Sequence, residues 1–147
     1  MNMALLYLLT MLAGAGIGVQ AGINSQLNVA WAKNPILTAF ASFLVGTLGL
    51  LIYLMAARVP WPPLPAKIVP WHWTGGLLGA FFVLIAIYAA PRLGATTMIA
   101  LILAGQIGMS LILDHFGLIG FAEKSLTWQR VLGAFLVGSG VFLIRRF

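Results

Sequence analysis

The chain has very few charged residues. Among its 147 residues 62% are hydrophobic and 7% are charged, and only Asp114 and Glu123 are acidic. A soluble domain usually carries roughly 25% charged residues. The composition therefore excludes an ordinary soluble domain and predicts an integral membrane protein.

Cysteine is absent, which excludes a disulfide framework and a thiolate metal site. The two histidines, His72 and His115, lie in different segments and form no zinc pattern, so we expect no metal and no other cofactor. The net charge is +6, but the basic residues flank apolar stretches and do not cluster on one face. We therefore expect no nucleic-acid partner.

Five long apolar stretches predict an all-α membrane protein with five transmembrane helices in a single domain, residues 1–147. A helix needs roughly 20 apolar residues to cross the hydrocarbon core. The last stretch is short, and we expect it to extend over residues 126–130. The stretches cover residues 3–27, 35–57, 73–90, 95–113 and 131–144.

Prolines mark the expected connections. Pro35 follows Lys33 and Asn34, and proline is favoured in the first turn of a helix. Residues 59–65 hold four prolines and cannot be helical, because each proline removes a hydrogen-bond donor and clashes with the preceding turn. We expect residues 91–94 to form a tight turn between the third and fourth helices.

The eight basic residues divide evenly between the two sides of the membrane that five spans would define. An excess of Lys and Arg in cytoplasmic loops normally sets orientation. Because neither side has an excess, we expect the chain to insert in both orientations and to pair with an inverted copy of itself. One side carries Arg58, Lys67, Lys124 and Arg130, and the other carries Lys33, Arg92, Arg145 and Arg146.

Neutral polar residues lie within the apolar stretches. Gln20 and Asn24 are four residues apart and share one helix face, Ser42 lies in the second stretch, and Gln106 lies in the middle of the fourth. An amide in hydrocarbon is costly unless it is paired. Two explanations remain open: hydrogen bonds between helices, or the polar lining of a substrate site.

No Asp, Glu, Lys or Arg lies in the middle of any stretch. A proton-coupled transporter usually keeps an ionisable group at membrane depth. The candidates for coupling are Asp114 and its neighbour His115, which also form the only pair resembling an acid–base couple, so we expect no enzyme. We favour a hydrated Asp114 at the headgroup level over a proton relay.

Four segments together resemble the YdcZ-like family, a five-helix bacterial branch of the drug/metabolite transporter superfamily. The resemblance covers essentially the whole chain, although no single segment is specific. Within the 105–117 segment it rests on Gly105-Gln106 and on Asp114-His115-Phe116-Gly117. The segments are residues 18–27, 42–48, 75–81 and 105–117.

The resemblance implies an antiparallel homodimer in the bacterial inner membrane and kinship with the small multidrug resistance exporters. Those exporters carry a glutamate in their first helix, and this chain has none there, so their proton-driven exchange does not carry over. We expect secondary transport of a small organic solute by alternating access, with Gln20, Asn24, Ser42 and Gln106 binding the substrate. The alternative is a non-transporting assembly or regulatory protein of the membrane.

A reporter fused to the C-terminus is expected to give signal from both sides of the membrane, because the basic residues are evenly divided. Two lysines added between Arg58 and Lys67 are expected to bias insertion to one orientation. Signal from one side only in the unaltered chain would contradict dual insertion.

Overall fold

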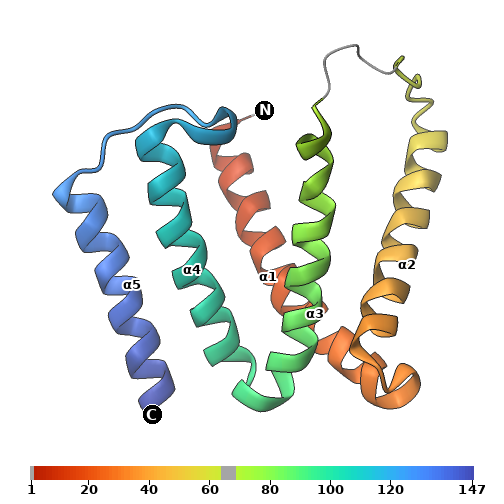
Figure 1. The fold of residues 1–147 in the computed structure, drawn as a ribbon, viewed down its shortest axis with the longest axis horizontal. Helices are drawn as coiled ribbons and strands as arrows, with labels where there is room; N and C mark the ends of the chain where they lie inside the picture. The colour runs from red at the N-terminus through yellow and green to blue at the C-terminus, as the bar shows by residue number, and fades with distance from the viewer. Residues whose placement is uncertain (1, 64–68) are drawn as a thin grey trace. The chain divides into compact units, whose positions relative to one another are not determined.

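The computed structural model describes residues 2–63 and 69–147. These residues form two compact units, Met1–Arg92 and Leu93–Phe147. Unit 1 holds α1 (Met3–Leu27), α2 (Pro35–Ala56) and α3 (Gly75–Leu93); unit 2 holds α4 (Ala95–Phe116) and α5 (Trp128–Arg146) (Figure 1). That the chain is one domain stays a prediction.

The all-α class is confirmed, and five long helices are present in the described part of the chain. The helices α1 to α4 are long and apolar enough to cross a membrane. In α5 the apolar stretch is confined between Arg130 and Arg145, and its crossing stays a prediction. The expected extension over residues 126–130 is confirmed in part, because α5 begins at Trp128, and Leu126 and Thr127 lie before it.

The connection between α1 and α2 follows the expected signals. A single π-helical turn, η1 (Asn28–Ala32), widens the end of α1, and Lys33 then adopts the left-handed conformation with φ 48°. The Asn34 side chain caps α2, because its Oδ1 accepts hydrogen bonds from the backbone N–H groups of Ile36 at 2.9 Å and Leu37 at 3.2 Å. Pro35 stands in the first turn, where its missing donor costs nothing.

The tight turn expected at residues 91–94 is wrong. Helix α3 continues through Pro91 and Arg92 to Leu93, and only Gly94, with φ 76°, lies between α3 and α4. A proline in the last turn removes one hydrogen bond but does not prevent the helix from continuing for two residues. The Arg92 side chain supports this end, because its Nη1 donates to the Tyr88 carbonyl at 2.6 Å.

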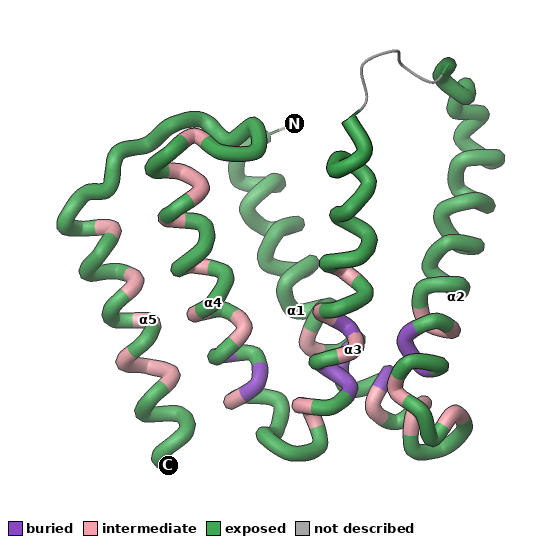
Figure 2. The backbone as a smooth tube through the Cα atoms, viewed as in Figure 1, coloured by how far each residue is buried: buried purple, intermediate pink, exposed green. Residues whose placement is uncertain are grey.

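The buried residues of unit 1 gather at one end (Figure 2). They come from the last part of α1, the first turns of α2 and the second half of α3. Ala39 of α2 packs against Val83 and Ile87 of α3 in a small apolar cluster. The first turns of α2 therefore lie beside the last turns of α3.

Most of the helix surface is not covered by other helices of the same unit. Between 0 and 17% of each candidate span is buried, and many large apolar side chains are exposed. Apolar side chains can face lipid without cost, so these surfaces suit a bilayer. Trp61, Trp71 and Trp73 are exposed beside the helix ends, which suits headgroup level. The prediction that Lys67 shares the loop with Arg58 falls outside the described residues.

The side chain of Thr38 links α2 to the π-helical turn. Thr38 is completely buried, and its hydroxyl lies 3.1 Å from Asn28 Oδ1 and 3.0 Å from the Asn34 carbonyl oxygen. Hydrogen bonds between membrane helices contribute about 0.6 kcal/mol on average.

Replacing Thr38 with valine keeps the shape of the side chain and removes the hydroxyl. We expect the free energy of unfolding in detergent to fall by about 0.6 to 1 kcal/mol. Thr47→Val is the matched control, because Thr47 is exposed on the same helix. Equal losses in the two variants would show that the Thr38 hydroxyl contributes nothing specific.

Candidate functional site

A row of amide side chains follows one face of α1 into the π-helical turn. Gln20, Asn24 and Asn28 are spaced four residues apart, so they succeed one another along the same face. Asn24 is buried, with 4% of its surface exposed, whereas Gln20 is exposed. The row extends the predicted pair by one residue, Asn28.

A shorter row of polar residues on α2 meets this row at the end of unit 1 where the buried residues gather. Thr38 contacts Asn28, and Ser42 lies one turn further along α2 and is half-buried. We call these five residues the polar seam: Gln20, Asn24, Asn28, Thr38 and Ser42. Ser42 therefore lies on the same face of α2 as Thr38, the residue that contacts Asn28.

Sequence analysis missed Asn28 and Thr38. The signal was present, because Asn28 continues the four-residue spacing of Gln20 and Asn24, and Thr38 stands four residues before Ser42. Both residues lie next to the Lys33–Pro35 connection, where polar residues are ordinary. Their contact depends on the π-helical turn, which the sequence does not reveal.

The Asn24 amide is the feature of the seam best suited to a ligand. Within residues 2–63 and 69–147 no side chain or backbone group hydrogen-bonds this amide, although the residue is buried. No polar side-chain atom in that part of the chain is both sealed off and unpaired. The polar atoms of the Asn24 side chain are therefore not fully sealed from the surface.

Gln106 lies midway along α4 in unit 2 and is exposed. None of the described residues hydrogen-bonds its amide. The structure describes the two units separately, so it does not bring Gln106 together with Gln20 and Asn24. That the three amides line one cavity stays a prediction.

Asp114 and His115, the candidates for coupling, have different partners. The Asp114 carboxylate forms an ion pair with Arg130 of α5, and Arg130 Nη1 also donates to the Lys124 carbonyl at 3.0 Å. The backbone N–H of Lys124 donates to the Asp114 carbonyl at 2.7 Å. Together these bonds hold the loop after α4 against both helices of unit 2.

His115 binds the same loop from its other side. Its Nδ1 accepts a hydrogen bond from the Leu126 backbone N–H at 3.3 Å, and its ring packs on Phe116. No hydrogen bond joins Asp114 to His115 in the described structure. The arrangement suits anchoring of the α4–α5 connection, and a coupling role for the two residues stays a prediction.

The chain is similar to proteins of one family. Residues 5–143 match the family model described as "Putative inner membrane exporter, YdcZ". The chain is also 30% identical over 141 residues to the "Inner membrane protein YdcZ" of Escherichia coli (strain K12), and the match covers 94% of each protein. No solved structure matches the chain.

Asp114→Asn is expected to leave transport and its pH dependence nearly unchanged, because Arg130 already occupies the carboxylate. The loss of this partly exposed ion pair should lower the free energy of unfolding by about 1 kcal/mol or less. Glu123→Gln is the control, since Glu123 is the other acidic residue. An Asp114→Asn variant that binds substrate but loses proton-driven accumulation would make Asp114 the coupling residue.

Proposed function

Because the chain belongs to the YdcZ family of inner membrane exporters, we propose that it moves a small organic solute across the membrane by secondary transport, as an antiparallel homodimer. The family resemblance found in the sequence is thereby confirmed. The chain is a multi-pass protein of the bacterial inner membrane, and the description of its family as inner membrane exporters supports a transporter.

The observation that carries the proposal is the exposure of amides within membrane helices. Gln20 and Gln106 lie inside α1 and α4 and are exposed in a single chain. Leaving an amide unpaired in hydrocarbon costs roughly 2 to 7 kcal/mol. Within its own unit neither side chain is covered, so each needs the other unit, a second copy or a polar cavity to cover it, and a dimer that encloses a substrate site meets this need.

The proposed substrate is neutral or weakly polar. In the described parts of α1 to α4, Lys, Arg, Asp and Glu occur only in the last turns, at Arg92 and Asp114. The polar seam and Gln106 offer donors and acceptors without a fixed charge. We propose that four polar side chains contact the substrate: Gln20, Asn24, Ser42 and Gln106. Asn28 and Thr38 hydrogen-bond each other and so hold the ends of α1 and α2 together.

An antiparallel pair supplies the inverted repeats that alternating access requires. In many transporters two inverted halves of one chain surround a site near the bilayer midplane. Here two copies of one chain take the place of the halves, and the even division of basic residues supports both orientations. We propose that α5, whose glycines Gly133, Gly138 and Gly140 have open space beside them, contributes to the dimer contact.

The test is uptake into proteoliposomes after a thermal-shift screen over small neutral and charged metabolites. A solute that stabilises the protein is expected to be taken up saturably, and empty liposomes are the control. Uptake that does not saturate would indicate a channel. The absence of both stabilisation and uptake over the panel would favour the non-transporting assembly or regulatory protein.

Replacing Gln20 or Asn24 with leucine is expected to abolish uptake and ligand stabilisation while the dimer stays intact, because the amides bind the solute. Gln26→Leu is the matched control, since Gln26 is an exposed amide on another face of α1. Dissociation of the dimer by Gln20→Leu or Asn24→Leu would instead show that the amides hold helices together.

A further inference from the structure

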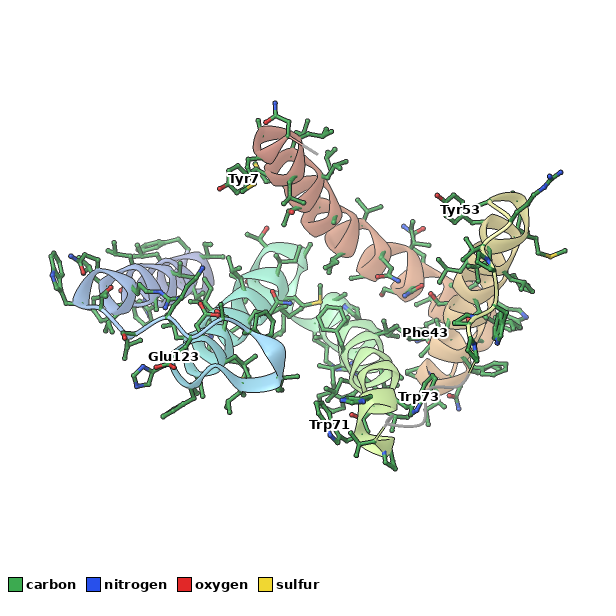
Figure 3. All side chains as sticks on the ribbon, turned by 90° about the horizontal axis from the view of Figure 1, so that it is seen from above. Tyr7, Phe43, Tyr53, Trp71, Trp73 and Glu123 are labelled. Atoms are coloured by element: carbon green, nitrogen blue, oxygen red, sulfur yellow. The ribbon has the colours of Figure 1, made fainter. Side chains whose placement is uncertain are left out.

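An apolar groove of about 470 Å³ runs between α2 and α3 on unit 1. Its floor is made of small residues, including Ala39, Gly76 and Ala80, and its walls carry the rings of Phe40, Phe43 and Phe81. Phe43 lies on the side of α2 that faces α3 (Figure 3), where its ring comes within 3.7 Å of the position that a Cβ would take at Gly79.

The groove suits a single hydrocarbon chain. Every residue that lines it is apolar, so it offers no hydrogen bond to a polar ligand. From Ile36 to Phe43 it follows α2 for about 10 Å, at 1.5 Å per residue. One leaflet contributes about 15 Å of the hydrocarbon core. The groove therefore covers much of the depth that an acyl chain occupies in one leaflet.

Two cationic side chains stand at one end of the groove. Lys33 is exposed just before α2, and Arg92 is exposed in the last turn of α3. These ends are neighbours, because Ala39 packs against Val83 and Ile87. Along α3, the groove residues Phe81 and Leu84 continue at helical spacing into Tyr88 and Arg92.

The Arg92 side chain is held against the last turns of α3, one turn beyond Tyr88, which itself lies one turn beyond the groove residue Leu84. Its Nη1 donates to the Tyr88 carbonyl, and its guanidinium carbon lies 5.6 Å from the centre of the Tyr88 ring. Unit 1 contains no acidic residue, since Asp114 and Glu123 both belong to unit 2. The positive charge at this end is therefore not neutralised within unit 1.

We propose that this groove binds an anionic phospholipid, with one acyl chain between α2 and α3 and the headgroup phosphate at Lys33 and Arg92. The charge of the chain favours a lipid over a second copy as the occupant. Lys33 and Arg92 are cationic and unit 1 holds no carboxylate that could pair with them, so the anionic headgroup of a lipid complements this end of the groove. The site does not depend on the transport proposal.

The test compares lipid retention by the purified protein in native mass spectrometry, with phosphatidylglycerol and phosphatidylcholine of identical acyl chains as probes. We expect phosphatidylglycerol to bind more tightly. Lys33→Gln and Arg92→Gln are each expected to weaken the binding of phosphatidylglycerol about fivefold. The attraction between one Lys or Arg and an anionic lipid surface strengthens binding by about that factor. Binding of phosphatidylcholine should not change in these two variants.

Arg58→Gln is the matched control for charge, because Arg58 follows the other end of α2. Ala80→Leu fills the groove floor and is expected to reduce retention of both lipids, whereas Ala13→Leu on an exposed part of α1 is expected to change neither. If Ala80→Leu does not fold, the charge variants alone decide the question.

Equal retention of the two lipids by the unaltered protein would overturn the proposal. An Arg58→Gln variant that loses as much phosphatidylglycerol as Arg92→Gln would also overturn it, since binding would then follow net charge alone. Dissociation of the dimer by Ala80→Leu with unchanged lipid retention would assign the groove to a second copy. Loss of lipid binding with normal solute uptake would separate this site from the transport site.

Discussion

The need to satisfy polar groups away from water governs this structure. Lipid offers no hydrogen bonds, so backbone groups within the membrane must pair inside helices, and polar side chains must pair or face a polar space. The described chain meets the first requirement with five long helices. It meets the second only in part, because the Asn28–Thr38 contact pairs two polar residues while the amides of Gln20, Asn24 and Gln106 remain without partners in one chain.

The two units meet the same constraint differently. Unit 1 holds its helices together at one end, through the polar seam and the cluster of Ala39, Val83 and Ile87. Unit 2 holds α4 and α5 through the ion pair of Asp114 and Arg130 and through backbone bonds of the loop between them. Polar side chains thus fix helix ends in both units, whereas the middle parts of the helices present apolar surface and a few unpaired amides.

This division separates structural from functional polar residues. A side chain with a charged partner, such as Asp114 with Arg130, helps to hold its unit together. A side chain without a partner among the described residues, such as Asn24, keeps its hydrogen-bonding capacity, and we propose that a solute uses it. The same reasoning favours a different ligand for the apolar groove on unit 1, because a lining made of apolar side chains suits hydrocarbon.

The sequence by itself determined the membrane class, the helices and the family, because apolar length, proline position and the Asn34 cap act locally along the chain. It also placed Gln20 and Asn24 on one face, since helical spacing is a local property. Only the tertiary structure paired Asn28 with Thr38 and Asp114 with Arg130, because these partners depend on how helices approach each other. The continuation of α3 through Pro91 is instead a local feature that the sequence analysis misjudged, since the Arg92 side chain binds the carbonyl of Tyr88 in the same helix.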